Sequence, residues 1–131
     1  MTGLDTNLLV RFFMGDHPEE SRRAASLMAS LSAAEPGWVG LTTLLEFVWV
    51  LKSVKRLDRA RIVLLLGDLL TQNSVVVEQR NAVESALQKY RNGRADFADC
   101  LIAASAKAAG CARTVTFDRI AARDAGMELV Q

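Results

Sequence analysis

Short strand-like segments alternate with longer helix-like segments along this chain, and that alternation limits its fold more than any other feature. In the longer segments the apolar residues recur with helical spacing, whereas short segments such as residues 74–77 are rich in β-branched residues. Two consecutive parallel strands need a crossover between them, and a helix is the usual one. We therefore expect an α/β fold in which helices cover both faces of a parallel sheet.

The boundaries of these segments follow from apolar periodicity and from glycine, proline and capping residues. The expected strands cover residues 1–4, 38–41, 74–77, 114–117 and 127–130. The expected helices cover residues 8–13, 18–32, 44–51, 58–70, 81–91, 96–109 and 118–125. The expected N-cap of the third helix is Thr42 or Thr43, and that of the fourth is Asp58. A chain of 131 residues has room for one hydrophobic core, so we expect a single domain over residues 1–131.

Composition excludes several classes of protein. No apolar run reaches the roughly 18 to 20 residues that span a bilayer, and the first residues lack the pattern of a secretory signal, so we expect a cytoplasmic protein. Two isolated cysteines and one histidine do not make a structural zinc site. A Ser-His-Asp triad would need His17, which precedes Pro18 and is typical of an exposed helix start. Any catalysis is then expected to depend on the 15 acidic residues.

Acidic residues occur where the expected strands end or where the following helices begin. Asp5 and Asp118 directly follow the first and fourth strands, and Glu46 lies one turn into the helix after the second strand. Asp96 and Asp99 fall in the first turn of an alanine-rich helix. Open parallel sheets bind ligands at the carboxyl ends of their strands. Carboxylates gathered there suit Mg²⁺ or Mn²⁺, which prefer oxygen ligands.

Each acid also has a structural interpretation. Asp5, Asp96 and Asp118 can be helix N-caps, and Asp99 can complete a capping box or favour the helix dipole. Glu46 is harder to explain, because apolar residues flank it on every side of its helix and no cation lies three or four residues away. We expect Glu46 to be buried against a distant partner or a metal, and the alternative is a position at the solvent-facing rim of the helix.

Four segments together resemble the successive motifs of the PIN domain. They are residues 5–11 (DTNLLVR), Glu46, residues 96–104 (DFADCLIAA) and residues 115–118 (VTFD). They occur in the family's order and cover nearly the whole chain, although Thr2 and Gly3 stand where the family usually has an apolar first strand. The chain resembles in particular the VapC toxins of prokaryotic toxin-antitoxin pairs, which are small ribonucleases. The resemblance implies a PIN-like three-layer α/β/α sandwich with a central, mostly parallel sheet.

The resemblance also implies a function and a site. The implied activity is that of a metal-dependent endoribonuclease that uses Mg²⁺ or Mn²⁺ and leaves 5′-phosphate and 3′-hydroxyl ends, because water attacks the phosphorus. The positions that match the catalytic and metal-ligating acids are Asp5, Glu46, Asp99 and Asp118. The auxiliary positions are Asp96, Asn7 and Thr116. The implied partners are an RNA substrate, a small cognate antitoxin protein and a second copy of the chain in a homodimer.

The charge balance becomes informative once these ligands are assigned. The net charge is +1, from 16 basic and 15 acidic residues, and by itself it points to no partner. With the four implied ligands set aside, 11 acids remain against 16 bases, a net charge of +5 that suits an RNA backbone. The bases that we consider for phosphate contact are Arg11, Lys52, Lys55, Arg56, Arg91, Arg94 and Arg119.

Two other functions remain open from the sequence. A phosphoaspartate protein, either a receiver or a phosphatase with Asp5 as nucleophile, would keep the fold, but the phosphatase pattern needs a second aspartate where Asn7 stands. A PIN-like protein without nuclease activity would serve as a binding module, although the presence of all four acids argues against it. The apolar residues of segments 44–51 and 59–70 exceed the needs of one small core, so we expect part of them to form an interface.

Overall fold

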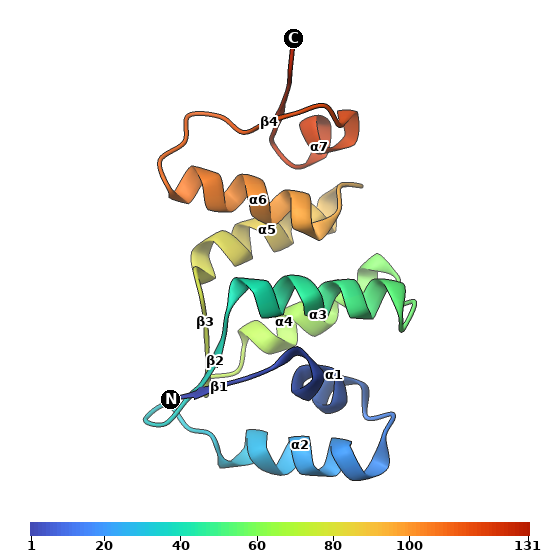
Figure 1. Cartoon of the computed structure of the whole chain (residues 1–131), viewed down its shortest axis with the longest axis vertical. Coiled ribbons are helices and arrows are strands. Elements are labelled where there is room, and N and C mark those ends of the chain that lie inside the picture. The colour runs from blue at the N-terminus through green and yellow to red at the C-terminus, as the bar shows by residue number, and fades with distance from the viewer. The chain divides into compact units, whose positions relative to one another are not determined.

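The computed structural model describes all 131 residues and contains alternating helices and short strands (Figure 1). The helices are α1 (Thr6–Met14), α2 (Pro18–Ser30), α3 (Leu41–Ser53), α4 (Arg59–Leu70), α5 (Arg80–Asn92), α6 (Phe97–Ala108) and α7 (Arg119–Asp124). The strands are β1 (Thr2–Gly3), β2 (Gly37–Val39), β3 (Val75–Val77), β4 (Val115–Thr116) and β5 (Glu128–Leu129). None of the helices combines the length and the apolar character that crossing a bilayer requires. Because every strand pair is parallel, the predicted α/β class is confirmed.

Two compact units make up the chain, and each is described by itself. Unit 1 covers Met1–Glu78 and unit 2 covers Gln79–Gln131. Unit 1 contains β1 to β3 with α1 to α4, and unit 2 contains β4 and β5 with α5 to α7. The single domain expected over residues 1–131 stays a prediction.

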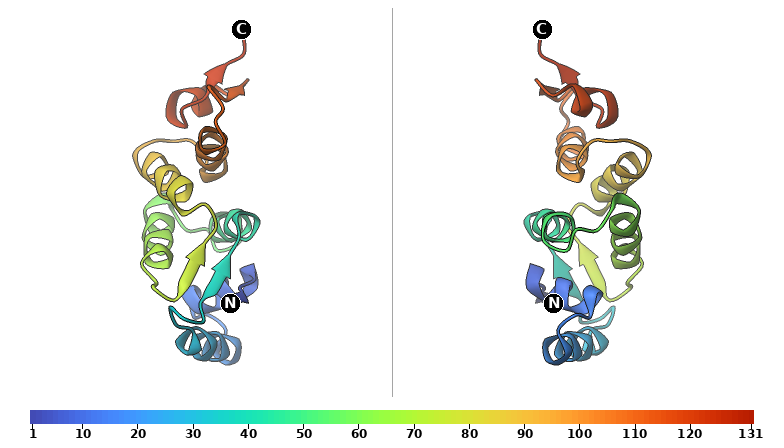
Figure 2. Two further views of the ribbon diagram at one scale, coloured as in Figure 1. Left: turned by 90° about the vertical axis from the view of Figure 1, so that its left-hand side faces the viewer. Right: turned by 90° about the vertical axis from the view of Figure 1, so that its right-hand side faces the viewer.

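A three-stranded parallel sheet organises unit 1. β2 lies in the middle and pairs with β1 on one side and with β3 on the other. Figure 2 shows α3 and α4 on either side of β2 and β3. β1 is only two residues long, because Thr2 and Gly3 are exposed and bring no apolar side chain to the core. The carboxyl end of β1 leads through Leu4 to Asp5, and that of β2 leads to the helix that carries Glu46.

Helix boundaries in unit 1 are set mainly by local capping. α1 begins at the N-cap Asp5 and ends at Gly15, which has the left-handed conformation (φ 62°) that glycine adopts without strain. α2 begins at His17, whose Nδ1 accepts a hydrogen bond from the backbone N–H of Glu20. α4 begins at the N-cap Asp58, as predicted. The prediction that His17 is an exposed helix start is confirmed, and its imidazole is engaged in capping.

One expected cap is wrong. α3 begins at Leu41 with Gly40 as its N-cap, and neither Thr42 nor Thr43 caps it. The backbone N–H of Leu41 instead donates a hydrogen bond of 2.8 Å to Oε1 of Glu78, the residue that follows β3. The first N–H of α3 is therefore satisfied by a side chain that follows β3, which no local pattern in the sequence could indicate.

Apolar side chains join the helices of unit 1 into a core. α1 packs against α2 and α3, and α3 packs against α4. Leu9, Phe47 and Leu66 are completely buried. The rings of Phe13 and Phe47 lie 5.7 Å apart between their centroids, which fixes α1 against α3. This packing joins α1 to the middle of α3 within unit 1.

Unit 2 consists of a helix pair and a small β-α-β element. α5 packs along α6, and the rings of Tyr90 and Phe97 meet edge to face with 5.7 Å between their centroids. β4 and β5 form a two-stranded parallel sheet, and α7 connects them. The five expected strands are thus present in order, but they form sheets of three and two strands. β4 and β5 are two residues long, and Val115 and Leu129 remain exposed, so little apolar area favours a longer pairing.

Asp124 ties the end of α7 to the turn between α5 and α6. Its Oδ2 accepts a hydrogen bond of 2.8 Å from the backbone N–H of Arg94, and both of its oxygens accept hydrogen bonds from the guanidinium of Arg123. A Cβ added to Gly93 would lie 2.9 Å from Cβ of Asp124, so this close approach requires glycine. The hydrogen bond from Arg123, followed by that from Arg94, lowers the pKa of Asp124 to about 2.

Replacing Asp124 by asparagine is expected to destabilise unit 2 near neutral pH and to have little effect in strong acid. A carboxylate whose pKa is lowered by folding adds stability above its unfolded pKa of 3.8, and this stability is lost as the pH falls to about 2. Urea unfolding of both proteins at neutral pH and near pH 2 measures the difference. Asp68→Asn is the control, because Asp68 is exposed and its carboxylate makes no hydrogen bond. A difference for Asp124→Asn that does not change with pH would contradict this role.

Candidate functional site

Asp5 occupies the junction between β1 and α1. Its Oδ1 accepts a hydrogen bond of 2.8 Å from the backbone N–H of Thr6. The buried hydroxyl of Thr6 donates to the carbonyl oxygen of Thr43 in α3, at 3.4 Å. This contact links the start of α1 to the turn of α3 that precedes Glu46. The helix-cap interpretation of Asp5 is confirmed, and the residue remains exposed to solvent.

One cavity of about 370 Å³ brings Asp5 and Glu46 together. Asn7 and Arg11 line it from α1, and Lys55 lines it from the segment after α3. The remaining lining residues are Thr6, Val10, Val50 and Val54. Two of the four implied ligands and one implied supporting residue therefore share a cavity within unit 1, together with two cationic side chains.

The prediction that Glu46 is buried is wrong. Glu46 is exposed, and Trp49, one turn further along α3, is 61% exposed. α3 buries Leu44, Phe47 and Leu51 on one face and leaves apolar side chains on the other. Apolar neighbours in the sequence therefore did not indicate burial, because this helix has an apolar face that nothing in unit 1 covers. The alternative that we considered, a glutamate facing solvent, is the one observed.

Three of the implied acids lie at the starts of two helices of unit 2. Asp96 precedes α6, Asp99 lies in its first turn, and Asp118 is the N-cap of α7. Burial raises the pKa of the half-buried Asp99, and the negative charges of Asp96 and Asp118 raise it further. Asp96 makes no side-chain hydrogen bond to the start of α6, so a capping box does not account for this pair. Two helix starts in unit 2 therefore carry acids whose charges act on Asp99.

Local hydrogen bonds fix Asp118. Its Oδ1 accepts a hydrogen bond of 2.8 Å from the backbone N–H of Ala121, and its own backbone N–H donates to Oγ1 of Thr116 at 3.0 Å. Thr116 is one of the three implied auxiliary residues, and this bond holds the backbone at Asp118. Of the other two, Asn7 lines the cavity of unit 1 and Asp96 raises the pKa of Asp99.

Sequence reasoning missed Glu78. It directly follows β3, and Asp5 lies two residues beyond β1, so the same rule about strand ends would have found it. Its hydrogen bond to the N–H of Leu41 anchors the start of α3. Its backbone N–H donates to the carbonyl oxygen of Val39 at 2.9 Å, which continues the pairing of β2 and β3. Glu78 thereby positions the helix that carries Glu46.

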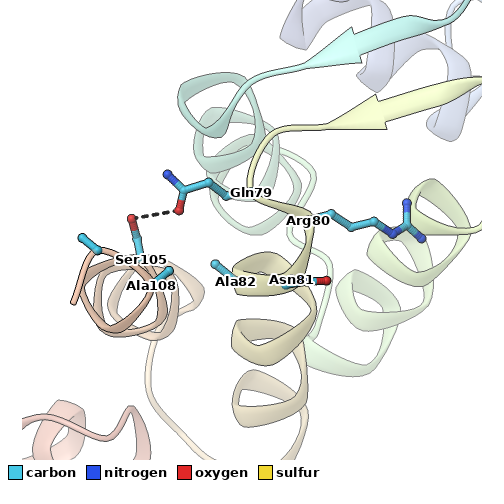
Figure 3. Close-up of a pocket in the computed structure, with 7 residues that line it drawn as sticks. Gln79, Arg80, Asn81, Ala82, Ser105 and Ala108 are labelled. Carbon is cyan, nitrogen blue, oxygen red and sulfur yellow. Dashed lines mark hydrogen bonds between the residues drawn. The ribbon is translucent and has the colours of Figure 1, made fainter. Parts of the chain in front are cut away.

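A further cavity of about 420 Å³ lies within unit 2, at the start of α5 (Figure 3). Gln79 and Ser105 point toward one another across it, and the Ser105 hydroxyl donates to Oε1 of Gln79 at 3.3 Å. Arg80 points away from this pair and forms an ion pair with Glu84. None of the implied acids lines this cavity, so we do not assign the site to it.

Comparison with known proteins gives the family. The PIN domain matches residues 4–126, a range that includes all the acids described above. The chain belongs to the PIN domain family. PIN domains are generally metal-dependent nucleases, and this places the chain in a nuclease-type family. No curated protein matches the chain significantly.

The donor groups of this PIN domain suit a divalent metal. Within neither unit do three or more histidine, cysteine, aspartate or glutamate side chains cluster as a complete metal site. Unit 1 offers the carboxylates of Asp5 and Glu46 in one cavity, and unit 2 offers those of Asp99 and Asp118. All four are oxygen donors, the type that Mg²⁺ and Mn²⁺ prefer. A bound cation would also offset the repulsion that raises the pKa of Asp99.

Proposed function

We propose that this PIN domain is an Mg²⁺- or Mn²⁺-dependent endoribonuclease and the toxin of a VapBC-type toxin-antitoxin pair. The observation that carries the proposal is the placement of acids at the ends of strands and the starts of helices in a chain of a nuclease-type family. The raised pKa of Asp99 supports it, because this carboxylate is half-buried and the negative charges of Asp96 and Asp118 act on it.

Asp5, Glu46, Asp99 and Asp118 are the proposed ligands, with Asp96 as an auxiliary acid. When bound, Mg²⁺ or Mn²⁺ supplies positive charge that acidifies a water molecule and neutralises the leaving oxygen. The protein's part is to hold its carboxylates in place. Asp5 is held by the N–H of Thr6, and Asp118 by the N–H of Ala121.

The proposed partners are RNA, a small antitoxin protein and a second copy of the chain, all in the cytoplasm. Exposed apolar side chains on α3 and α4 support a protein partner, since Trp49 and Leu64 are more than half exposed. Sedimentation equilibrium of the isolated protein at micromolar concentration tests the homodimer, and a monomer would argue against it.

Purified, antitoxin-free protein is expected to cut cellular RNA at few sites when Mg²⁺ or Mn²⁺ is present and to be inactive in EDTA. Mapping of the 5′ ends should find 5′-phosphates, because water and not the ribose 2′-hydroxyl is the attacking group. Asp5→Asn should abolish the cuts, because it removes the charge of a ligand. Asp68→Asn, an exposed aspartate of α4, should keep them. No cleavage by folded protein with either metal would reject the nuclease and favour a binding module.

A further inference from the structure

Two cations share the cavity of Asp5 and Glu46, and they are fixed in place by ion pairs. Nζ of Lys55 lies 2.6 Å from Oδ2 of Asp16, and Nη1 of Arg11 lies 3.8 Å from Oδ1 of the same carboxylate. These contacts link α1 to the segment after α3. Asp16 therefore bridges both cations from the loop that follows α1.

A second carboxylate fixes Arg11 from α2. Nε of Arg11 donates to Oε1 of Glu20 at 2.6 Å. The side chains of Arg11 and Lys55 are 25% and 23% exposed, so both are partly buried. The hydrogen bond from Lys55 lowers the pKa of Asp16, and that from Arg11 lowers the pKa of Glu20. Both carboxylates therefore stay ionised at neutral pH, and the ion pairs persist.

Hydrogen-bonding capacity remains on both cations after these contacts. A guanidinium has five N–H donors and an ammonium has three. Arg11 forms one hydrogen bond, through Nε, and Lys55 forms one, to Asp16. The remaining donors belong to side chains that line the cavity. They are suited to the oxygens of a phosphate group, which a guanidinium binds with paired hydrogen bonds.

The ligand that fits this cavity must satisfy opposite demands. The carboxylates of Asp5 and Glu46 attract a cation, whereas the spare donors of Arg11 and Lys55 attract an anionic acceptor. A phosphodiester accompanied by a divalent cation meets both demands. Arg11 also lines a second cavity of about 430 Å³ toward α2, which shares Asp5 and Asn7 with the first. A ligand bound at Arg11 therefore has room to continue on both sides, which suits a polymer better than a small anion.

We infer that Arg11 and Lys55 bind the phosphate backbone of the RNA strand beside Asp5 and Glu46, and that Asp16 and Glu20 are positioning residues for them. This inference rests on the proposed function, since it names residues that bind the substrate of the same site. It selects two of the seven bases that the sequence left as equal candidates for phosphate contact.

Arg11→Gln and Lys55→Gln are each expected to weaken RNA binding by about tenfold. The probe is a fluorescent, mixed-sequence single-stranded RNA, measured by anisotropy in EDTA so that nothing is cut. Each variant should also reduce the slope of log affinity against log salt by about 0.7, because one phosphate contact fewer releases fewer counterions. Arg22→Gln and Arg61→Gln are matched controls at exposed arginines of α2 and α4, and the slope should stay unchanged.

Asp16→Asn separates positioning from general electrostatic attraction. The change removes a negative charge, so attraction alone would strengthen RNA binding. Loss of positioning predicts the opposite, a severalfold weaker affinity, because Lys55 and Arg11 lose their shared partner. Tighter binding by Asp16→Asn would overturn the positioning role. Urea unfolding confirms that each variant is folded, and Arg11→Lys, which keeps the charge and loses the paired donors, replaces Arg11→Gln if that variant unfolds.

The outcomes distinguish this inference from the proposed function. Wild-type protein that cuts RNA while both cation variants keep the wild-type affinity and salt slope would refute the role of Arg11 and Lys55 alone. Wild-type protein that never cuts RNA, with both variants weakened in binding, would refute the nuclease and leave the phosphate contacts standing.

Discussion

Asp99→Asn is expected to lower RNA cleavage by about two to three orders of magnitude at saturating Mg²⁺. The substitution keeps the size of the side chain and removes its negative charge, so the proposed metal loses a ligand whose effect is several kcal/mol in the transition state. Asp99 is half-buried, and the negative charges of Asp96 and Asp118 act on it. The measurement is kcat/KM on a short RNA that contains a mapped cleavage site.

Asp96→Asn is the control for the loss of cleavage expected from Asp99→Asn. Asp96 is exposed and is proposed only as an auxiliary acid, so its loss should reduce cleavage much less than the loss of Asp99. Calorimetric titration with Mn²⁺ should show the same order, with weaker binding by Asp99→Asn. Equal cleavage by wild type and Asp99→Asn would remove Asp99 from the proposed ligands. Equal losses in both variants would make Asp96 a ligand as well.

Phe47→Ala is expected to destabilise the protein by about 3 to 5 kcal/mol, the usual cost of deleting a buried aromatic side chain. Phe47 is completely buried in α3 and contacts the ring of Phe13 in α1. Its loss leaves a cavity between the helix that begins at Asp5 and the helix that carries Glu46. Urea unfolding, followed by circular dichroism, measures the change in the free energy of unfolding.

Trp49→Ala on the same helix is the matched control. Trp49 is as large as any side chain in the protein and lies two residues from Phe47, but it is 61% exposed. Its removal should change the stability of the isolated monomer by no more than about 0.5 kcal/mol. A loss as large as that of Phe47→Ala would mean that Trp49 is covered in solution.

The comparison of Phe47 with Trp49 also explains where sequence reasoning succeeded and where it failed. Asp5, Asp58 and Asp118 were predicted as helix starts because a cap depends on residues within one turn. The burial of Glu46 was predicted from apolar neighbours, and it failed because burial depends on which helix face another element covers. Local chemistry is present in the sequence, whereas the covering of a helix face is decided by tertiary packing.

Contacts between distant residues show the same limit. The cap that Glu78 provides for α3 spans 37 positions, and the ion pair of Asp16 with Lys55 spans 39. Both were absent from the sequence-based interpretation, since no periodicity connects residues so far apart. The order of strands and helices was predicted correctly, but strand lengths were overestimated at β1, β4 and β5, where few buried apolar residues favour pairing.

The hydrogen bond between Glu78 and Leu41 has a consequence for folding during translation. Residue 78 is synthesised well after α3, so the N–H of Leu41 has no hydrogen bond to Glu78 until that residue has been added. Over the same interval β2 can pair with β1 but not with β3, because β3 ends only at Val77. A nascent chain that ends before residue 78 lacks the hydrogen bond that anchors the start of the helix carrying Glu46. The full set of contacts that positions this helix in unit 1 therefore forms only after the last residue of that unit has left the ribosome.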